Sequence, residues 1–161
     1  MTPRIPILAL ALLLCTGVTI VAQPSVERDV ASARDVYRQV EHEIAARRLA
    51  RNDSTVACGA LDAEVRRYLD ATGRVRKLTV EGGSGDHAET VDYYYDAAGR
   101  LRFAFASRGA VNMTHQEERV WYTPAGSAAR RTRRVTAGPG YPFGDLSAVP
   151  DPGEWHHVWC G

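Results

Sequence analysis

Histidines beside carboxylates are the residues of this 161-residue chain whose types could support acid–base catalysis. His115 is followed closely by Glu117 and Glu118. A general acid–base pair requires groups that converge and have shifted pKa values, and spacing along the chain establishes neither condition. The polar residues around this stretch favour a solvated connector. We therefore expect no catalytic residue, with a hydrolase that uses His115 or His156 and nearby carboxylates as the alternative.

The adjacent residues His156 and His157 could contribute to a metal site, together with His87, Asp86 or His115. Neighbouring side chains of an extended segment point to opposite sides, so two adjacent histidines rarely ligate one ion. The further ligands of a zinc site do not follow at a fixed spacing. The sequence therefore predicts structural or exposed histidines, no metal and no cofactor.

The glycine-rich run GGSG at 82–85 has the composition of a nucleophile elbow or a phosphate-binding loop. An elbow needs a glycine two residues after the serine, where this chain has Asp86. A phosphate-binding loop needs a following Lys-Ser/Thr pair and a helix, and the sequence provides neither. The run therefore predicts a connector between two strands.

Four arginines form the densest charged run of the chain, namely Arg130, Arg131, Arg133 and Arg134. On a strand, Arg131 and Arg133 share one face and the other two share the opposite face. Acidic lipid headgroups, an anionic glycan or an acidic protein outside the cytoplasm would suit such a run. The alternative is a solubilising edge strand whose charges block pairing with another sheet.

Aromatic residues are concentrated between residues 93 and 122. Strict alternation assigns one face, which we expect to be the helix-packed core, to Tyr93, Tyr95, Phe103 and Phe105. The same alternation places Tyr94 and Trp121 on the other, open face. Aromatic side chains on an open face are typical of recognition surfaces, although they also form cross-strand pairs that only stabilise a sheet. We expect a binding surface of Tyr94 and Trp121 with the four arginines at its rim.

A long helix that would position this sheet is predicted over residues 25–51. Ser25 can cap it, and apolar residues recur at intervals of four and three from Val26 to Ile44. The turn-forming run NDS at 52–54 would end it. Such a narrow apolar stripe predicts a helix that packs on one surface.

Residues 60–136 change to a period of two and contain three related segments. These are YLDATGRV at 68–75, YYYDAAGRL at 93–101 and the weaker copy WYTPAG at 121–126. Each reads as a strand, a tight turn with a glycine in the left-handed conformation, and a second strand. Three such hairpins predict an antiparallel meander of about six strands.

The segment at 93–101 resembles the YD (RHS-type) hairpin repeat of bacterial surface proteins, and 68–75 is a looser match. The resemblance covers about thirty residues and implies the geometry of a hairpin, without an activity. RHS proteins join dozens of such units into a closed shell, which three units cannot form. The predicted helix and the C-terminal tail have no counterpart in that repeat.

The first 22 residues have the layout of a secretory signal peptide, because Arg4 precedes an apolar run that ends at Ala22. Its removal leaves a single α+β domain over 23–161, while an uncleaved membrane anchor is the alternative. That domain carries nineteen basic and nineteen acidic side chains, which argues against general electrostatic binding of nucleic acid. One lysine among twenty basic residues suggests a GC-rich bacterial genome.

Two cysteines lie outside this leader, Cys58 and Cys160. An even number in an exported chain predicts a disulfide between them. The bond would tie down the tail at 137–161, whose Gly, Pro and aromatic residues predict a loop that packs on the sheet.

These observations predict an extracytoplasmic α+β domain, periplasmic or secreted, with one long helix on a β-meander and a disulfide-tied tail. The expected function is non-enzymatic recognition of a protein or an envelope component. A structural envelope protein is a further alternative to the hydrolase. Contact with a membrane is expected only if the N-terminal segment stays uncleaved.

Overall fold

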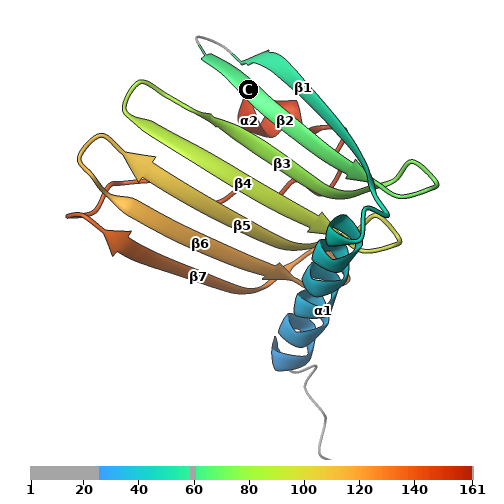
Figure 1. Cartoon of the computed structure of the whole chain (residues 1–161). Helices are drawn as coiled ribbons and strands as arrows, with labels where there is room; N and C mark the ends of the chain where they lie inside the picture. Colours follow the sequence, from blue (N-terminus) through green and yellow to red (C-terminus); the bar gives the residue numbers. More distant parts are fainter. Residues whose placement is uncertain (1–25, 59–60, 161) are drawn as a thin grey trace, which may run out of the picture.

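The computed structural model describes residues 26–58 and 61–160 (Figure 1). The expected signal peptide lies outside the described residues. A helix, α1 (Val26–Ala45), precedes a seven-stranded antiparallel sheet whose strands are neighbours in chain order. The strands are β1 (Ala50–Cys58), β2 (Leu61–Leu69), β3 (Val75–Gly83), β4 (His87–Tyr95), β5 (Leu101–Ala110), β6 (His115–Tyr122) and β7 (Ala128–Ala137). A short helix, α2 (Trp155–Trp159), follows in the tail. In these ranges no helix is long and apolar enough to cross a membrane.

The expected α+β class is confirmed, but the helix is shorter and the sheet one strand larger than the sequence predicted. α1 has 20 residues and ends at Ala45, and Arg47 leaves it with a φ of 55°. The run at 52–54, predicted as a turn, lies inside β1, which pairs with β2 along its whole length. The ladder hydrogen bonds of this pairing outweigh the turn preference of the three side chains.

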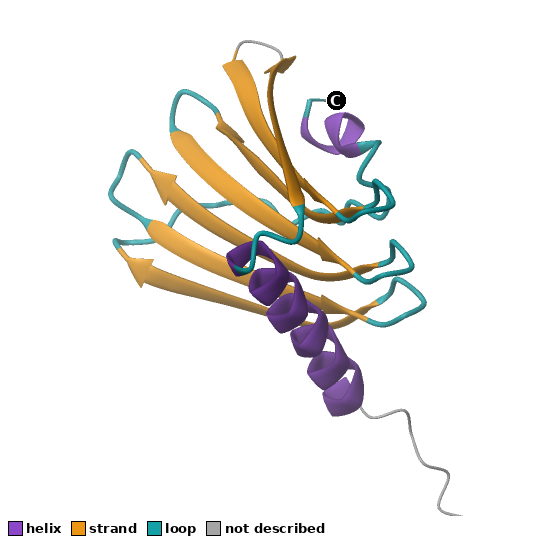
Figure 2. Ribbon diagram, turned by 45° about the vertical axis from the view of Figure 1, so that its right-hand side comes forward, coloured by secondary structure: helices purple, strands orange, loops and turns teal. Residues whose placement is uncertain are grey.

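The sheet is covered on both sides by different parts of the chain. α1 lies across one side, which we call the helix face (Figure 2). The tail covers the other side, which we call the tail face. On the helix face, Val30, Ala33 and Val40 of α1 are fully buried against the sheet. The tail face holds the larger apolar core, which includes Val65, Leu78, Val80, Val91, Tyr93, Tyr95 and Val120.

Each of the three hairpins has a β-bulge directly after its turn. Opposite Tyr94 and Tyr95, the paired residues are Phe103 and Leu101, so Arg102 is an extra residue in β5. The hairpins β2–β3 and β6–β7 have the same irregularity at equivalent positions. A bulge places two consecutive side chains on one side, so the alternation of the strand changes phase there.

This change of phase overturns the predicted distribution of the aromatic residues. Leu101 faces the tail beside Tyr95, whereas Phe103 faces the helix beside Tyr94. Tyr94 and Trp121 are therefore not on an open face: their exposed fractions are 2% and 7%, because α1 packs over them. The prediction of an exposed surface around these two residues is wrong.

The turns of the first two hairpins are stabilised by the same kind of contact. In the first two hairpins the side chain of Asp70 or Asp96 accepts two backbone N–H groups from the turn that follows. Gly73 and Gly99 both have a φ of 80°, a conformation that favours glycine. These shared contacts explain why the same residue types recur in the two turns.

The tail packs on the sheet, as the sequence predicted. The hydroxyl groups of Tyr93 and Tyr95 donate hydrogen bonds to the carbonyls of Ser147 (3.2 Å) and Val149 (2.8 Å). A disulfide joins Cys58 to Cys160 across a sequence separation of 102 residues. The predicted disulfide is thus present, and it ties the end of α2 to the end of β1.

Candidate functional site

A groove of about 540 Å³ runs between α1 and the helix face of β3–β6. Its floor holds the aromatic side chains of Tyr94, Phe103, Phe105 and Trp121. Its wall on α1 consists of Arg34, Tyr37, Arg38 and Glu41. Lys77, Asp92 and Arg119 complete the lining from the sheet. We call this the helix–sheet groove, and its volume lies within the range of small-molecule sites.

The floor is a continuous row of rings from three neighbouring strands. The ring centroid of Phe103 lies 5.7 Å from that of Tyr94 and 5.5 Å from that of Trp121. Tyr37 of α1 stands edge-on over the row, 5.1 Å from Tyr94. At these distances aromatic rings attract one another, so the floor is held in place before any ligand arrives.

Three cations of the groove lie over three rings of its floor. The pairs are Arg34 over Trp121 at 5.7 Å, Lys77 over Tyr94 at 4.9 Å and Arg119 over Phe105 at 4.8 Å, each to the ring centroid. A cation in this position is attracted by the negative face of the ring while its N–H groups remain able to donate. Arg34 and Arg119 were not singled out from the sequence.

The end of the groove at β3 and β4 is a compact polar cluster. The Nζ atom of Lys77 lies 3.0 Å from Glu41 Oε1 and 3.2 Å from Asp92 Oδ2. The Tyr94 hydroxyl donates to Glu41 Oε1 at 2.7 Å. Burial lowers the pKa of Lys77, but Asp92 and Glu41 outweigh this effect and leave the pKa raised. Burial, together with the charges of Asp92 and Glu41, raises the pKa of Tyr94.

The four arginines predicted as a rim do not share one surface with Tyr94 and Trp121. Arg130 pairs with Glu27 of α1, on the helix face. Arg134 is exposed and lies opposite Glu117 in register. Arg131 and Arg133 lie on the tail face, where both bind Glu118, so no single patch unites the predicted residues.

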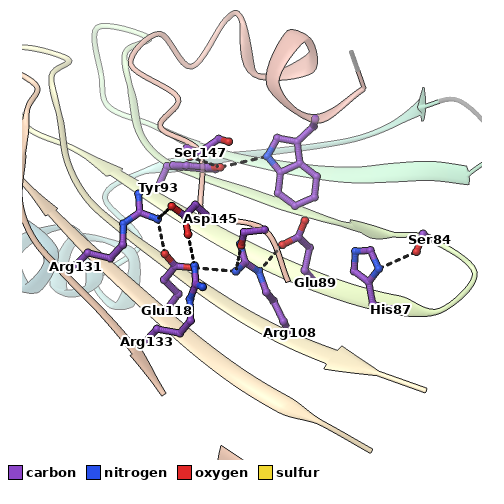
Figure 3. Close-up of polar contacts among 12 residues, drawn as sticks. Ser84, His87, Glu89, Tyr93, Arg108, Glu118, Arg131, Arg133, Asp145 and Ser147 are labelled. Atoms are coloured by element: carbon purple, nitrogen blue, oxygen red, sulfur yellow. Dashed lines mark hydrogen bonds and ion pairs between the residues drawn. The ribbon is translucent and has the colours of Figure 1, made fainter. Parts of the chain in front are cut away.

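Glu118 is the centre of a buried charge cluster on the tail face (Figure 3). Its carboxylate lies 2.8 Å from Arg108, 2.6 Å from Arg131 and 3.1 Å from Arg133. Asp145 of the tail binds Arg133 at 2.6 Å. The residue predicted to lie in a solvated connector is in fact fully buried in β6. Its cluster joins the sheet to the tail.

The run predicted as a connector is one only in its second half: Gly82 and Gly83 end β3, and residues 84–86 lead to β4. This connector brings Ser84, Asp86 and His87 together. Ser84 Oγ lies 2.8 Å from His87 Nδ1, and Asp86 Oδ1 lies 3.1 Å from the same nitrogen (the first contact is drawn in Figure 3). A catalytic triad needs the serine and the carboxylate on opposite ring nitrogens. Hydrogen bonds from Ser84, Tyr141 and His87 hold the pKa of Asp86 well below its usual range. The arrangement stabilises a turn and lacks the geometry of a proton relay.

The remaining histidines are not assembled into a site. His115 is exposed, and its expected partners Glu117 and Glu118 point to opposite faces of β6. His156 and His157 are exposed on α2, with ring centroids 3.8 Å apart. Across 26–58 and 61–160, no group of three or more His, Cys, Asp or Glu residues is arranged to hold a metal ion.

Comparisons with known proteins found no relative of this chain. Neither protein-family models, nor curated proteins, nor solved structures give a match. The inference of function therefore depends on the helix–sheet groove and its chemistry.

Proposed function

We propose that this protein is a non-enzymatic recognition module whose helix–sheet groove binds a ligand with an anionic group and an apolar body. The single observation that carries the proposal is the stacking of three cations on three floor rings. Carboxylates compensate Lys77 and Arg119, so the charge of Arg34 beside the apolar rings is what attracts a ligand with negative charge next to apolar area. The proposed binding surface therefore lies in a groove, whereas the sequence predicted an open sheet face.

The position of Arg34 supports this proposal most directly. Its side chain is exposed at the mouth of the groove, and within the described residues it forms no ion pair. Trp121 holds the guanidinium from one side. A ligand anion can therefore reach an arginine that is already oriented, which limits the entropy lost on binding.

The ligand belongs to the surroundings of an exported protein. We propose an extracytoplasmic location, with which the disulfide between Cys58 and Cys160 is consistent. The interaction partners would be a protein or a component of the cell envelope that enters the groove.

The test uses anilinonaphthalenesulfonate, an anionic aromatic probe whose fluorescence rises in apolar sites. We expect saturable binding to the wild type and about tenfold weaker binding to Arg34→Ala, because a hydrogen bond to a charged group is lost. Arg48→Ala is the matched control, since it removes an exposed arginine outside the groove. Circular dichroism verifies that all variants are folded. This control is needed because partly unfolded proteins also bind the probe.

Equal affinities for the two variants would refute the proposal, as would the absence of saturable binding. A second readout uses Lys77, which is the only lysine of the chain. Amine acylation followed by mass spectrometry reports on this one side chain and the N-terminus. The bound probe should slow acylation of Lys77, and an unchanged rate would contradict binding in the groove.

A further inference from the structure

The two ends of the helix–sheet groove carry opposite net charge. At the end on β3 and β4, one cation, Lys77, lies between two carboxylates, Glu41 and Asp92. The formal charge of this end is therefore −1. Both Lys77 and Tyr94 contact Oε1 of Glu41, so in the described part of the chain Oε2 is left to accept a donor from a ligand.

The end on β6 has the reverse balance. Two cations, Arg34 and Arg119, lie there. Glu117 pairs with Arg119 at 2.9 Å, so one of the two charges is compensated, and Arg38, between the two ends on α1, is compensated by Asp35. The formal charge of this end is +1, and it is concentrated on Arg34 above the Trp121 ring.

Two independent measures give the separation between the backbone positions that carry these ends. Along α1, Arg34 and Glu41 are seven residues apart, which corresponds to about 10.5 Å at the rise of an α-helix. Across the sheet, Asp92 pairs with Phe105 and Phe105 with Arg119, so the two charged residues are two strand spacings apart, about 9.6 Å. A complementary ligand thus carries a cation and an anion about 10 Å apart.

We propose that the natural ligand of the groove is a short zwitterionic peptide of about three residues, bound through both of its free termini. This inference rests on the function proposed above and specifies its ligand. An extended tripeptide spans about 10–11 Å, which matches the separation of the charged ends. Its ammonium group lies at Glu41 and Asp92, its carboxylate lies at Arg34, and an apolar central side chain contacts Phe103 and Phe105.

Other ligand classes match the groove less well. A fatty acid supplies the anion for Arg34 but no donor for the acidic end, so Oε2 of Glu41 gains no partner. A ligand with two anionic groups would bring the second one against Glu41 and Asp92, and like charges repel in a partly buried site. An internal protein segment has neither terminal charge.

The inference is tested by calorimetric titration at pH 7 with Ala-Phe-Ala and its blocked forms. We expect the free tripeptide to bind, and N-acetylation or C-amidation each to weaken binding by about tenfold because one charged contact is lost. In Arg34→Ala the amidated and free peptides should bind equally, whereas acetylation should still weaken binding. In Glu41→Gln the acetylated and free peptides should bind equally, whereas amidation should still weaken binding. This substitution keeps an acceptor for Tyr94 and so leaves the wall of the groove in place.

The outcomes separate the two proposals. A doubly blocked peptide that binds as tightly as the free one overturns the inference. So does sensitivity to amidation that persists in Arg34→Ala, or sensitivity to acetylation that persists in Glu41→Gln. Binding of the naphthalenesulfonate probe without binding of any tripeptide overturns the peptide as ligand but leaves the groove as a binding site. If neither compound binds, both proposals fail.

Discussion

The substitution Glu118→Gln tests how far the tail depends on the buried charge cluster. Glu118 has no exposed side-chain area, and it is held by three arginines, of which Arg108 is itself buried. Removal of one partner of a buried ion pair costs about 3–5 kcal/mol, since the other charge stays buried without compensation. Glutamine keeps the shape and one acceptor, and Arg108 keeps Glu89 at 2.8 Å, so we expect about 3 kcal/mol.

The assay is urea unfolding of the oxidised protein, followed by tryptophan fluorescence. With an m-value of about 2 kcal/mol/M, the midpoint should fall by about 1.5 M. Glu117→Gln is a matched control, because it changes the adjacent residue of the same strand on the other face. Its partner Arg119 is half-exposed, so the loss should be under about 1 kcal/mol. Equal midpoints for the two variants would refute the assignment of Glu118 as the electrostatic link between sheet and tail.

Three further predictions concern the tail, the turns and pH. Cys58→Ser with Cys160→Ser should lower the free energy of unfolding by about 4–5 kcal/mol, since the bond closes a long loop; a urea midpoint that equals the wild type's would contradict this. Gly138→Ala should cost more than Gly99→Ala in the same assay, because both have a positive φ but only at Gly138 would a Cβ atom meet backbone, 2.5 Å from the Met113 carbonyl. Burial raises the pKa values of Tyr93, Tyr94 and Tyr95, and that of Tyr122 to about 12. Their contribution to stability is full below about pH 10, the unfolded value, and is lost as the pH rises through the folded pKa values. Tyrosinate absorbance in the native protein should therefore lag behind that of the urea-unfolded chain above pH 10, and coincident curves would disprove it.

Local sequence patterns predicted much of this fold because turns and hairpins depend on interactions between residues close in the sequence. The three glycine turns, the pairing of strands within each hairpin and the packed tail all depend on residues close in sequence or on the two cysteines available. β1 was not predicted, because its polar residues 50–58 become a strand only through pairing with β2. Ladder formation with a neighbour is not encoded in the alternation of the strand itself.

The candidate site was predicted less well, for one geometrical reason. The sequence singled out Tyr94 and Trp121, which line the groove, but assigned them to an exposed face. A single extra residue such as Arg102 reverses the face of every later residue in its strand, and binary patterning assumes that none is present. Two sequence features could have pointed to other residues of the groove. One is the unique lysine, and the other is the set of basic residues off the apolar stripe of α1.

The same bulges also determine where α1 lies, and hence the shape of the groove. In the first two hairpins the extra residue is an arginine that points toward the helix: Arg76 contacts Glu43 at 3.2 Å and Arg102 contacts Ser32 at 3.1 Å. In the third hairpin the extra residue is Ala129, and its neighbour Arg130 contacts Glu27. The Nε atoms of Arg76 and Arg102 also donate to the carbonyls of Tyr95 and Tyr122 in the next hairpin. Because these contacts come from three successive hairpins, α1 crosses the strands at a fixed height. The wall formed by Arg34 and Glu41 then stands at a defined distance from the aromatic floor, which a binding site for a ligand of fixed length requires.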